Sequence, residues 1–404
     1  MLTILPLASD LNSPVVVAAT LDRIADRLTR HEVRHRFVGT GDPPPDALLI
    51  LTGGTEHLAL AALEQTAGPV FLLAHPERNS LPAALEVMSR LQQLGRSGRI
   101  FLLDGADGAD EPLARLSHHL ITRRRLQQAR LGRIGAPSDW LVASMPPPEL
   151  VTAVWGPEVV DVPIAEVVEA LRAIGPDEVA AIRDEMVAGA EAVREPSPAD
   201  LGAAAGVAAA LLRVVREHRL DACSVRCFDL VTGQRTTGCL ALSRLLDEGV
   251  VAGCEGDLPA TLTMLWLQAV TGLPSFMANP QDIDAGAGTL ALAHCTVARR
   301  MVTRYTLRSH FESSLGVGIE GEIPPGPATV ARIGGPDLRA LYASDGEVIA
   351  APAREQRCRT QVLVRLDADV RELLARPLGN HHILSPGHRS RDLREYHDLF
   401  VRAA

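Results

Sequence analysis

Residues 249–267 read GVVAGCEGDLPATLTMLWL: a short apolar run, two carboxylates, and a long apolar segment. The first run predicts a buried strand and residues 258–270 a helix, so Glu255 and Asp257 fall at a strand-to-helix junction. Ligands of open α/β sheets bind at this end of a strand. Asp257, close before Pro259, could equally cap the helix, and both interpretations stay open for it. Capping does not explain Glu255, for which we predict a functional role.

The same alternation of apolar runs and helix-length segments fills the N-terminal part of the chain. Strands are predicted over 2–8, 47–52, 70–74 and 99–103, with helices over 15–29 and 81–94. A second series has strands over 139–144, 159–162 and 223–228, with helices beginning near 149, 176, 200, 239 and 258. Continuous apolar strands separated by helices are typical of parallel sheets buried on both faces. We therefore predict two doubly wound α/β domains, residues 1–125 and 126–303.

The pattern changes near residue 304, where strand-like runs punctuated by glycine and proline replace the long helices. The predicted strands cover 304–310, 328–333, 338–343, 347–350 and 361–366, and a closing helix covers 392–402. Strands without intervening helices favour a small antiparallel β domain, residues 304–404. The predicted fold class is thus α/β, with two parallel-sheet domains and a C-terminal antiparallel β domain.

Charge and hydropathy disfavour two classes of partner. The formal net charge is −9, whereas proteins that neutralise phosphates usually carry a basic stripe. The run Arg123–Arg125 is better interpreted as a solvated helix face. The N-terminus has no basic residues before its apolar stretch, and residues 201–215 suit a buried helix rather than a membrane span. We expect a cytoplasmic protein with no nucleic-acid and no membrane partner.

The six cysteines form no CxxC pair and sit inside apolar runs. Reduced core thiols are the favoured interpretation. A zinc site built from Cys223 and Cys227 is an alternative that spacing alone supports weakly.

Histidines offer ligands for a metal. His294 ends a short apolar strand, and His381 and His382 follow Gly379 in a loop. Each could instead be a core or surface histidine. Together with Glu255, His294 and one histidine of the adjacent pair would supply one carboxylate and two imidazoles, a set that suits Mn²⁺ or Co²⁺.

His310 and Glu312 would point to the same face of a strand and could hydrogen-bond a polyhydroxylated ligand. An exposed polar strand face explains them as well, and we favour it from the pattern alone. The chain has no Walker A motif, no GxGxxG after its first strand and no GxSxG elbow, so nucleotide binding has no support.

Several motifs together resemble the L-fucose isomerase/L-arabinose isomerase superfamily, especially its shorter fucose-isomerase-like members. In the C-terminal half they are SVRCFDL (224–230), GCLALSRLLDEGVVAGCEGDLPATLTMLWL (238–267), PSFMANPQDID (274–284), ALAHCT (291–296), RSHFESSLGVGI (308–319), ARIGG (331–335) and GNHHILSPGH (379–388). LTGGTE (51–56) and AHPERNSLPAALEV (74–87) are less specific.

The resemblance implies two Rossmann-like domains followed by a β domain, which agrees with the pattern above. It also implies a homo-oligomer, a trimer or hexamer, with the pocket at a subunit interface. A neighbouring chain would contribute N-terminal residues, for which His75 and Asn79 are the candidates.

The resemblance also implies a ligand set for a divalent metal, for which we predict Mn²⁺. Glu255, His294 and His382 match the family's ligands, while Asn279 stands where the family has a second acidic ligand. Asn279 can ligate through its carbonyl oxygen but cannot exchange a proton, and Asp257, Asp282 or Asp284 could compensate.

The function that follows is a metal-dependent aldose–ketose isomerase acting on an open-chain sugar through an enediolate. Glu255 or Asp257 would move the proton between C1 and C2. The substrate-binding candidates are Arg226, Asp229, His310, Glu312, Asn380 and His381.

Three rival functions remain. The first is an isomerase of an anionic sugar such as a sulfosugar of the sulfoquinovose type, with Arg226, Arg308 or His388 as counter-charge. The second is a non-catalytic sugar-binding or regulatory protein on the same scaffold, suggested by Asn279. The third, ranked last, is a zinc hydrolase.

Overall fold

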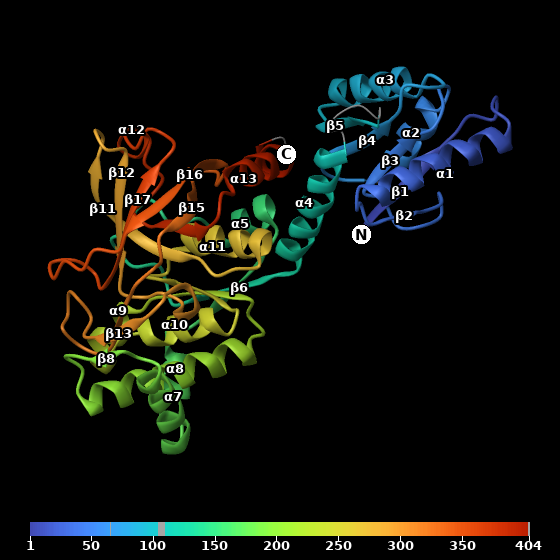
Figure 1. Cartoon of the computed structure of the whole chain (residues 1–404). Helices are drawn as coiled ribbons and strands as arrows, with labels where there is room; N and C mark the ends of the chain where they lie inside the picture. Colours follow the sequence, from blue (N-terminus) through green and yellow to red (C-terminus); the bar gives the residue numbers. More distant parts are fainter. Residues whose placement is uncertain (65, 104–109, 403–404) are drawn as a thin grey trace. The chain divides into compact units, whose positions relative to one another are not determined.

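The computed structural model describes residues 1–64, 66–103 and 110–402. The chain forms two compact units. Unit 1 comprises Met1–Arg124 with Glu395–Ala404, and unit 2 comprises Arg125–Arg394. Figure 1 labels the helices and strands of both units.

Unit 1 is built on a five-stranded parallel sheet of order β2-β1-β3-β4-β5. The strands are β1 (Leu2–Leu7), β2 (His35–Phe37), β3 (Ala47–Ile50), β4 (Val70–Ala74) and β5 (Gly98–Leu102). The helices are α1 (Pro14–Arg30), α2 (Glu56–Leu63), α3 (Ser80–Gln93) and the short η2 (Asp398–Arg402). Two helices cross the boundary between the units: α4 (Asp110–Gln128) ends in unit 2, and α13 (Ser390–His397) begins there.

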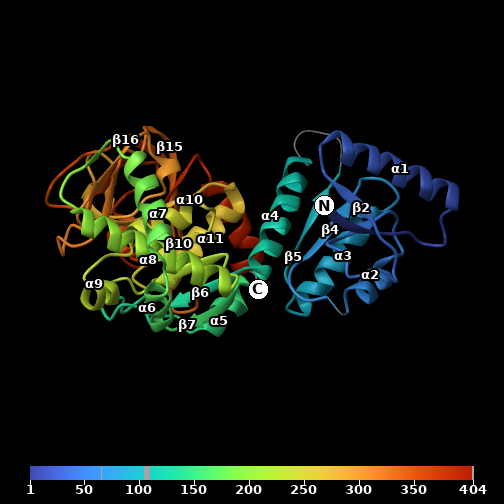
Figure 2. The same ribbon diagram turned by 90° about the horizontal axis from the view of Figure 1, so that it is seen from below.

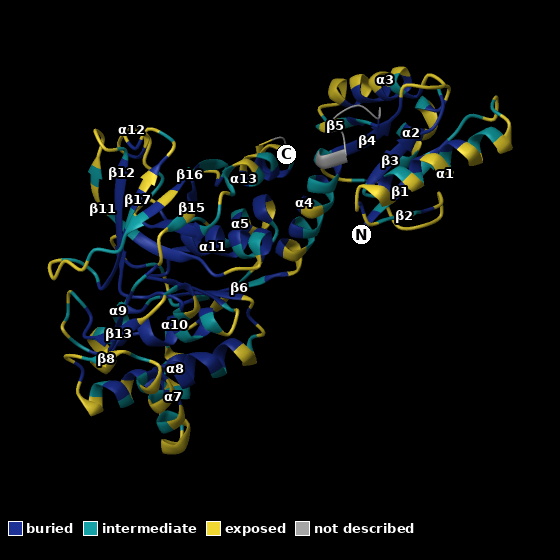
Figure 3. Ribbon diagram, in the orientation of Figure 1, coloured by how far each residue is buried: buried dark blue, intermediate teal, exposed yellow. Residues whose placement is uncertain are grey.

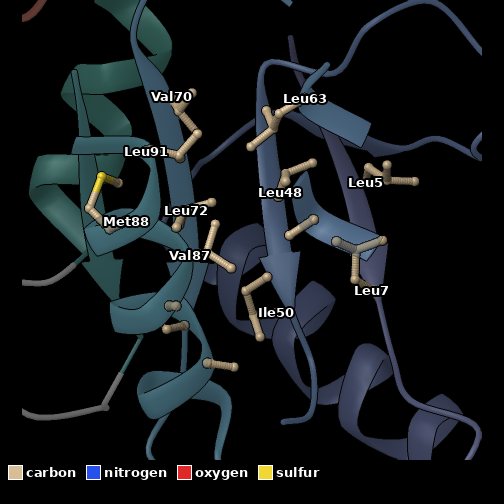
Figure 4. Close-up of a cluster of buried hydrophobic side chains, with 14 of the residues drawn as sticks. Leu5, Leu7, Leu48, Ile50, Leu63, Val70, Leu72, Val87, Met88 and Leu91 are labelled. Carbon is tan, nitrogen blue, oxygen red and sulfur yellow. The ribbon is translucent and has the colours of Figure 1, made fainter. Parts of the chain in front are cut away.

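The core of unit 1 lies between its sheet and its helices. Leu48, Ile50 and Leu72 of the sheet meet Val87 and Leu91 of α3 (Figure 4). Both β3 and β4 are buried along their whole length. This explains why they read as continuous apolar runs.

Unit 2 contains a four-stranded parallel sheet of order β10-β9-β6-β7. Its strands are β6 (Arg130–Ile134), β7 (Glu158–Val162), β9 (Ala222–Val225) and β10 (Val251–Cys254). Its helices are α5 (Pro148–Trp155), α6 (Ile164–Arg172), α7 (Pro176–Ala188), α8 (Pro198–Glu217), α9 (Phe228–Gln234), α10 (Cys239–Asp247) and α11 (Leu258–Thr271).

Helix α8 is the one helix of the described chain that is long and apolar enough to cross a membrane by length and composition. In the structure, 67% of its apolar window is buried, and it packs against α6, α7 and α10 (Figure 2). A reciprocal capping box between Ser197 and Asp200 starts it,. The helix is therefore a core element of unit 2, as the sequence predicted.

The rest of unit 2 is a closed antiparallel barrel of order β11-β12-β17-β16-β15-β18. Its strands are β11 (Phe276–Asp284), β12 (Thr289–His294), β15 (Gly326–Gly334), β16 (Ala340–Ala350), β17 (Thr360–Leu366) and β18 (His382–Pro386). A small sheet of β8 (Ala192–Val193), β13 (Tyr305–Arg308) and β14 (Gly318–Gly321) adjoins it, with the short helices η1 (Arg299–Met301) and α12 (Glu372–Ala375).

Helix α11 contacts both parts of unit 2. It packs against β9 and β10 of the parallel sheet and against β11, β15 and β18 of the barrel. Almost all of its residues are buried (Figure 3), which suits its all-round apolar sequence. The start of α11 is therefore the point where sheet and barrel residues can meet.

The predicted fold class is confirmed in its coarse form: parallel-sheet α/β parts and a C-terminal antiparallel β part. The strand predicted over 139–144 is wrong. These residues form turns after β6, in a loop rich in proline that exposes Trp140,. The separate strands predicted over 338–343 and 347–350 are one strand, β16.

The predicted boundaries at residues 125 and 303 stay a prediction. The parallel sheet of unit 2 and the barrel share one compact unit, and β11 and β12 of the barrel precede residue 304. Periodicity alone does not distinguish a barrel strand from a strand of a parallel sheet, so it could not assign the hairpin 276–294 to the barrel.

Candidate metal centre

The junction between β10 and α11 has an unusual backbone. Glu255 and Gly256 both have positive φ, 63° and 76°, and Asp257 is the N-cap of α11. A Cβ at Gly256 would lie 2.6 Å from Cα of Pro137, so only glycine fits. A glutamate in the left-handed region is rare and indicates strain that the surroundings enforce. The carbonyl of Glu255 accepts a hydrogen bond from Ser138 N at 2.8 Å.

This backbone turn directs the Glu255 carboxylate into the interior of unit 2. Oε2 accepts a hydrogen bond from Nε1 of Trp140 at 2.6 Å, and Oε1 lies 3.7 Å from Nε2 of His381. Burial works to raise the pKa of Glu255, but His381 and the Trp140 N–H outweigh it, and the pKa lies below its usual value,. Glu255 is therefore an anion held in a mostly buried place.

His381 is oriented by a buried network. Its Nδ1 donates to Oδ2 of Asp257 at 2.9 Å, and Nη1 of Arg332 donates to the same oxygen at 3.0 Å. Oδ1 of Asp257 accepts from Ala260 N at 2.9 Å, which caps α11. All three charged side chains of the network are fully buried. A carboxylate on one ring nitrogen fixes the ring of a metal-binding histidine and leaves the other nitrogen available.

The charges of this network shift the pKa values of its members. Burial disfavours the charged form of Asp257, but Arg332 and His381 outweigh it and lower its pKa to about 2. Burial likewise works against protonated His381, yet Asp257 and Glu255 raise its pKa to about 9. The metal-free site therefore holds a protonated His381 between two carboxylates.

His294 completes the group from the end of β12. Its ring centroid lies 5.7 Å from that of His381, and one ligand atom each of Cys254, Glu255 and His294 lies within 4.8 Å of the others. Burial lowers the pKa of His294 to about 3, so its ring is neutral. Nδ1 of His294 and Nε2 of His381 are buried and have no hydrogen-bond partner among the residues described. Two orphaned imidazole nitrogens beside a carboxylate fit a divalent ion.

A cavity of about 40 Å³ opens at this group. That volume suits an ion with roughly two or three waters. Predicted residues in its wall are Glu255, Asn279, His294, His310 and Glu312, and the remaining lining residues are Cys227, Phe228, Val231, Thr237, Gly238, Cys239, Cys254, Cys295 and Cys358. The cavity therefore collects residues from β10, β11, β12 and the loop after β13.

His310 and Glu312 reach the cavity for a different reason from the predicted one. Strand β13 ends at Arg308, so the two residues lie in a turn and not on a strand face. The His310 ring packs edge-on against Phe228, with centroids 5.9 Å apart.

His382 makes contacts of its own, and no contact joins it to Glu255 or His294 among the residues described. Its Nδ1 is 3.2 Å from the carbonyl of Asn380, its ring packs edge-on against Tyr342, and burial lowers its pKa to about 4. Adjacent residues at a strand start point to opposite sides, so only one of the pair can face Glu255. In this structure that one is His381, whereas the sequence had assigned the metal to His382.

Asn279 lines the cavity, and the exposed Asn380 hydrogen-bonds to it. Asn279 lies on β11, and Nδ2 of Asn380 donates to its Oδ1 at 3.3 Å. Asp282 and Asp284, proposed as substitutes for a missing carboxylate, lie farther along β11 and do not line the cavity.

Arg226 and Asp229 pair with each other at 3.0 Å and do not line the cavity. Arg226 also contacts Asp139, the neighbour of Trp140. Arg308 is enclosed by Glu195, Glu320 and Glu355, so its charge is already balanced. His388 lies 3.1 Å from the carbonyl of Gly346.

His75 and Asn79 belong to unit 1. His75 is fully buried, with Nε2 2.9 Å from the carbonyl of Leu51, and burial lowers its pKa. Asn79 is exposed at the start of α3 with φ of 57° and makes no side-chain capping bond.

Sequence reasoning missed Trp140 and Arg332. Arg332 stands in the apolar stretch around the quoted ARIGG segment, and a lone charge in a buried strand could have signalled a buried carboxylate partner. Trp140 lay in a stretch interpreted as a strand, and nothing local links it to Glu255.

No family model matches the chain. The chain is similar to a sulfoquinovose isomerase of Clostridium sp. (strain MSTE9), with 32% identity over 163 residues, 38% of this chain and 36% of the relative. It is also similar to a sulfoquinovose isomerase of Alkalicoccus urumqiensis, with 23% identity over 200 residues, 47% of this chain and 45% of the relative. The chain thus spans less than half the length of the curated relatives it matches.

Proposed function

We propose that this chain is a divalent-metal-dependent isomerase that interconverts the aldose and ketose forms of an anionic, sulfonated sugar. The main support is that Glu255, His294 and His381 come together from three distant segments: Glu255 and His294 line one cavity, and His381 lies beside both of them. The partial similarity to two sulfoquinovose isomerases supports the sugar class. The motifs shared with the L-fucose/L-arabinose isomerase superfamily support the same chemistry on Rossmann-like domains.

The residues present fit a borderline divalent ion such as Mn²⁺. Glu255, His294 and His381 would hold it, and Asn279 could add a neutral oxygen. This exchanges the roles predicted for His381 and His382. When bound, the ion would polarise the sugar carbonyl and stabilise the negative charge that develops on it.

Glu255 is the residue that we assign to proton transfer between C1 and C2. It is ionised, lines the cavity and is held by the Trp140 N–H, so it can accept a proton at a fixed place. Asp257 cannot serve in the same way, because both of its oxygens are engaged and it is fully buried. We assign it to the positioning of His381.

Hydroxyl groups of the sugar would contact His310 and Glu312 in the cavity wall. Among the predicted counter-charges for a sulfonate we retain Arg226, although it lies outside the cavity wall, because Arg308 is enclosed by three carboxylates. Arg226 can exchange its ion pair with Asp139, whose side chain is 87% exposed, for one with the sulfonate at little cost in free energy.

The test is incubation with sulfoquinovose and a panel of neutral aldoses in D₂O with Mn²⁺, before and after chelation. We expect aldose–ketose exchange and deuterium at C1 or C2 only with the sulfosugar and only with metal. Glu255→Gln should abolish both, while Glu217→Gln, the same change on an exposed helix end, should not. Undiminished exchange by Glu255→Gln would rule out the assignment.

Binding of the sulfosugar without any deuterium incorporation would instead identify the rival function, a non-catalytic sugar-binding protein. If only neutral aldoses were exchanged, the protein would still be an isomerase, but the proposal of an anionic substrate would be rejected.

A further inference from the structure

One wall of the cavity is made of thiols. Five of the six cysteines of the chain line it: Cys227, Cys239, Cys254, Cys295 and Cys358. They come from the β9–α9 loop, α10, β10, the end of β12 and the segment before β17. Proton transfer to a sugar requires none of them, so the isomerase mechanism leaves this wall without a role.

One of these thiols, Cys254, belongs to the metal group, and a second, Cys227, lies next to it. Sγ of Cys227 and Sγ of Cys254 are 2.9 Å apart. Sγ of Cys254, an oxygen of Glu255 and a ring nitrogen of His294 all lie within 4.8 Å of one another. Two sulfurs, one oxygen and one nitrogen make a four-ligand set. Around a tetrahedral zinc ion such atoms are about 3.3 to 3.8 Å apart, from metal–ligand distances of about 2.0 to 2.3 Å. Cys254, Glu255 and His294 already lie within 4.8 Å of one another, and the side chain of Cys227, next to Cys254, would have to turn toward them.

We propose that the cavity is also a binding site for a thiophilic divalent ion, Zn²⁺ or Cd²⁺, held by Cys227 and Cys254 together with Glu255 and His294. The ion replaces one proton on each thiol, so two protons leave to solvent for each ion bound and no electron is transferred. Mn²⁺ prefers oxygen and nitrogen donors, so Glu255, His294 and His381 would hold it without the thiols.

The two ions exclude each other, because both need Glu255 and His294. This consequence rests on the proposed function: Zn²⁺ or Cd²⁺ would inhibit the isomerase at the metal site itself, and chelation followed by Mn²⁺ would restore it. The thiol wall would make the activity of the protein sensitive to thiophilic metals.

The test is titration of the metal-free full-length protein with Cd²⁺ under reducing conditions. We expect an ultraviolet charge-transfer band of Cd²⁺–thiolate bonds that saturates at one ion, with release of two protons per ion. Cys254→Ser and Cys227→Ser should each weaken Cd²⁺ binding by at least roughly 10- to 100-fold. Loss of a residue that only hydrogen-bonds to a metal ligand already costs that much affinity. The matched control is Cys223→Ser, because Cys223 is buried in β9 and lies outside the cavity wall. This variant should keep the wild-type affinity for Cd²⁺.

Thermal melting of each variant confirms that it is folded, and Cys254→Ala repeats the test without a hydroxyl. A missing band, or a weakening by Cys223→Ser equal to that of Cys254→Ser, would overturn the proposal. The band needs no substrate, so it separates the two proposals. A Cd²⁺ site in a protein without sulfosugar exchange would reject only the isomerase, and exchange without the band would reject only the thiophilic site.

Discussion

Two carboxylates two residues apart have different tasks because their surroundings differ. Glu255 lines the cavity and has one neutral donor, the Trp140 N–H. Asp257 is fully enclosed, with Arg332, His381 and a helix N-terminus as partners. The sequence left capping and function equally open for Asp257. The structure shows the cap, and it adds a second role, the orientation of His381.

Asp257→Asn should destabilise the protein and weaken its metal site. The change leaves the buried Arg332 charge without its counter-charge, which costs about 3 to 5 kcal/mol of the free energy of unfolding. Loss of the carboxylate on His381 should weaken Mn²⁺ binding roughly 10- to 100-fold. Denaturant unfolding and Mn²⁺ titration measure the two effects.

Asp229→Asn is the control for this variant, because the Arg226–Asp229 pair is partly exposed and contributes at most about 1 kcal/mol. Equal losses in the two variants would contradict the buried-network account.

Metal binding should depend on pH through His381. Its pKa in the metal-free protein is raised to about 9, so below that pH the ion must displace a proton. The affinity for Mn²⁺ should therefore rise about tenfold per pH unit toward pH 9 and level off above it. Mn²⁺ titrations across about pH 6.5 to 8.5 measure the slope.

The protonated His381 has the opposite effect on the metal-free protein. Because its folded pKa lies above its unfolded value near 6.5, it contributes stability that is complete below about pH 6.5 and lost as the pH rises through about 9. Metal affinity that does not change across this range would show that His381 is not a ligand.

At the scale of elements, the β10–α11 junction decides where Glu255 points. Gly256→Ala should disrupt this junction, since the new Cβ would lie 2.6 Å from Pro137 Cα and 2.9 Å from the carbonyl oxygen of Ala136. We expect a loss of about 1 to 3 kcal/mol in the free energy of unfolding and loss of Mn²⁺ binding, measured by denaturant unfolding and titration.

Gly202→Ala in α8 is the matched control, because nothing lies within 4 Å of its Cβ position. In a helix interior this change should stabilise by about 0.5 to 1 kcal/mol. Intact metal binding in Gly256→Ala would show that the turn does not position Glu255.

The elements themselves were largely predictable. Apolar runs such as 70–74 became strands, and the segment 258–270 became α11, because these patterns depend on local periodicity. The strand predicted over 139–144 was wrong. A run with one exposed tryptophan resembles a strand in composition, but these residues form turns.

At the scale of the whole molecule, we predict a homo-oligomer in which one chain completes the site of another. Asn79→Gly removes only a side chain, because glycine accepts the φ of 57° at this position,. If Asn79 serves a neighbouring chain, Asn79→Gly and Glu255→Gln chains should each be inactive, and co-expressed mixtures should recover up to roughly a quarter of the sites.

Isomerase assays on the purified mixed oligomers measure this recovery. Full activity of Asn79→Gly alone would remove Asn79 from the site. No recovery from two inactive variants would place both residues in the site of a single chain.

The sequence by itself determined the classes of element, the placement of Glu255 at the end of a strand, and His294 at the end of another. Hydrophobic periodicity and helix caps are local, so they can be read from neighbouring residues. Which histidine of the 381–382 pair faces Glu255 was decided only by the tertiary structure. That choice depends on the register of β18 in the barrel and on the buried Arg332–Asp257 pair, contacts between residues 75 to 124 positions apart that no local pattern contains.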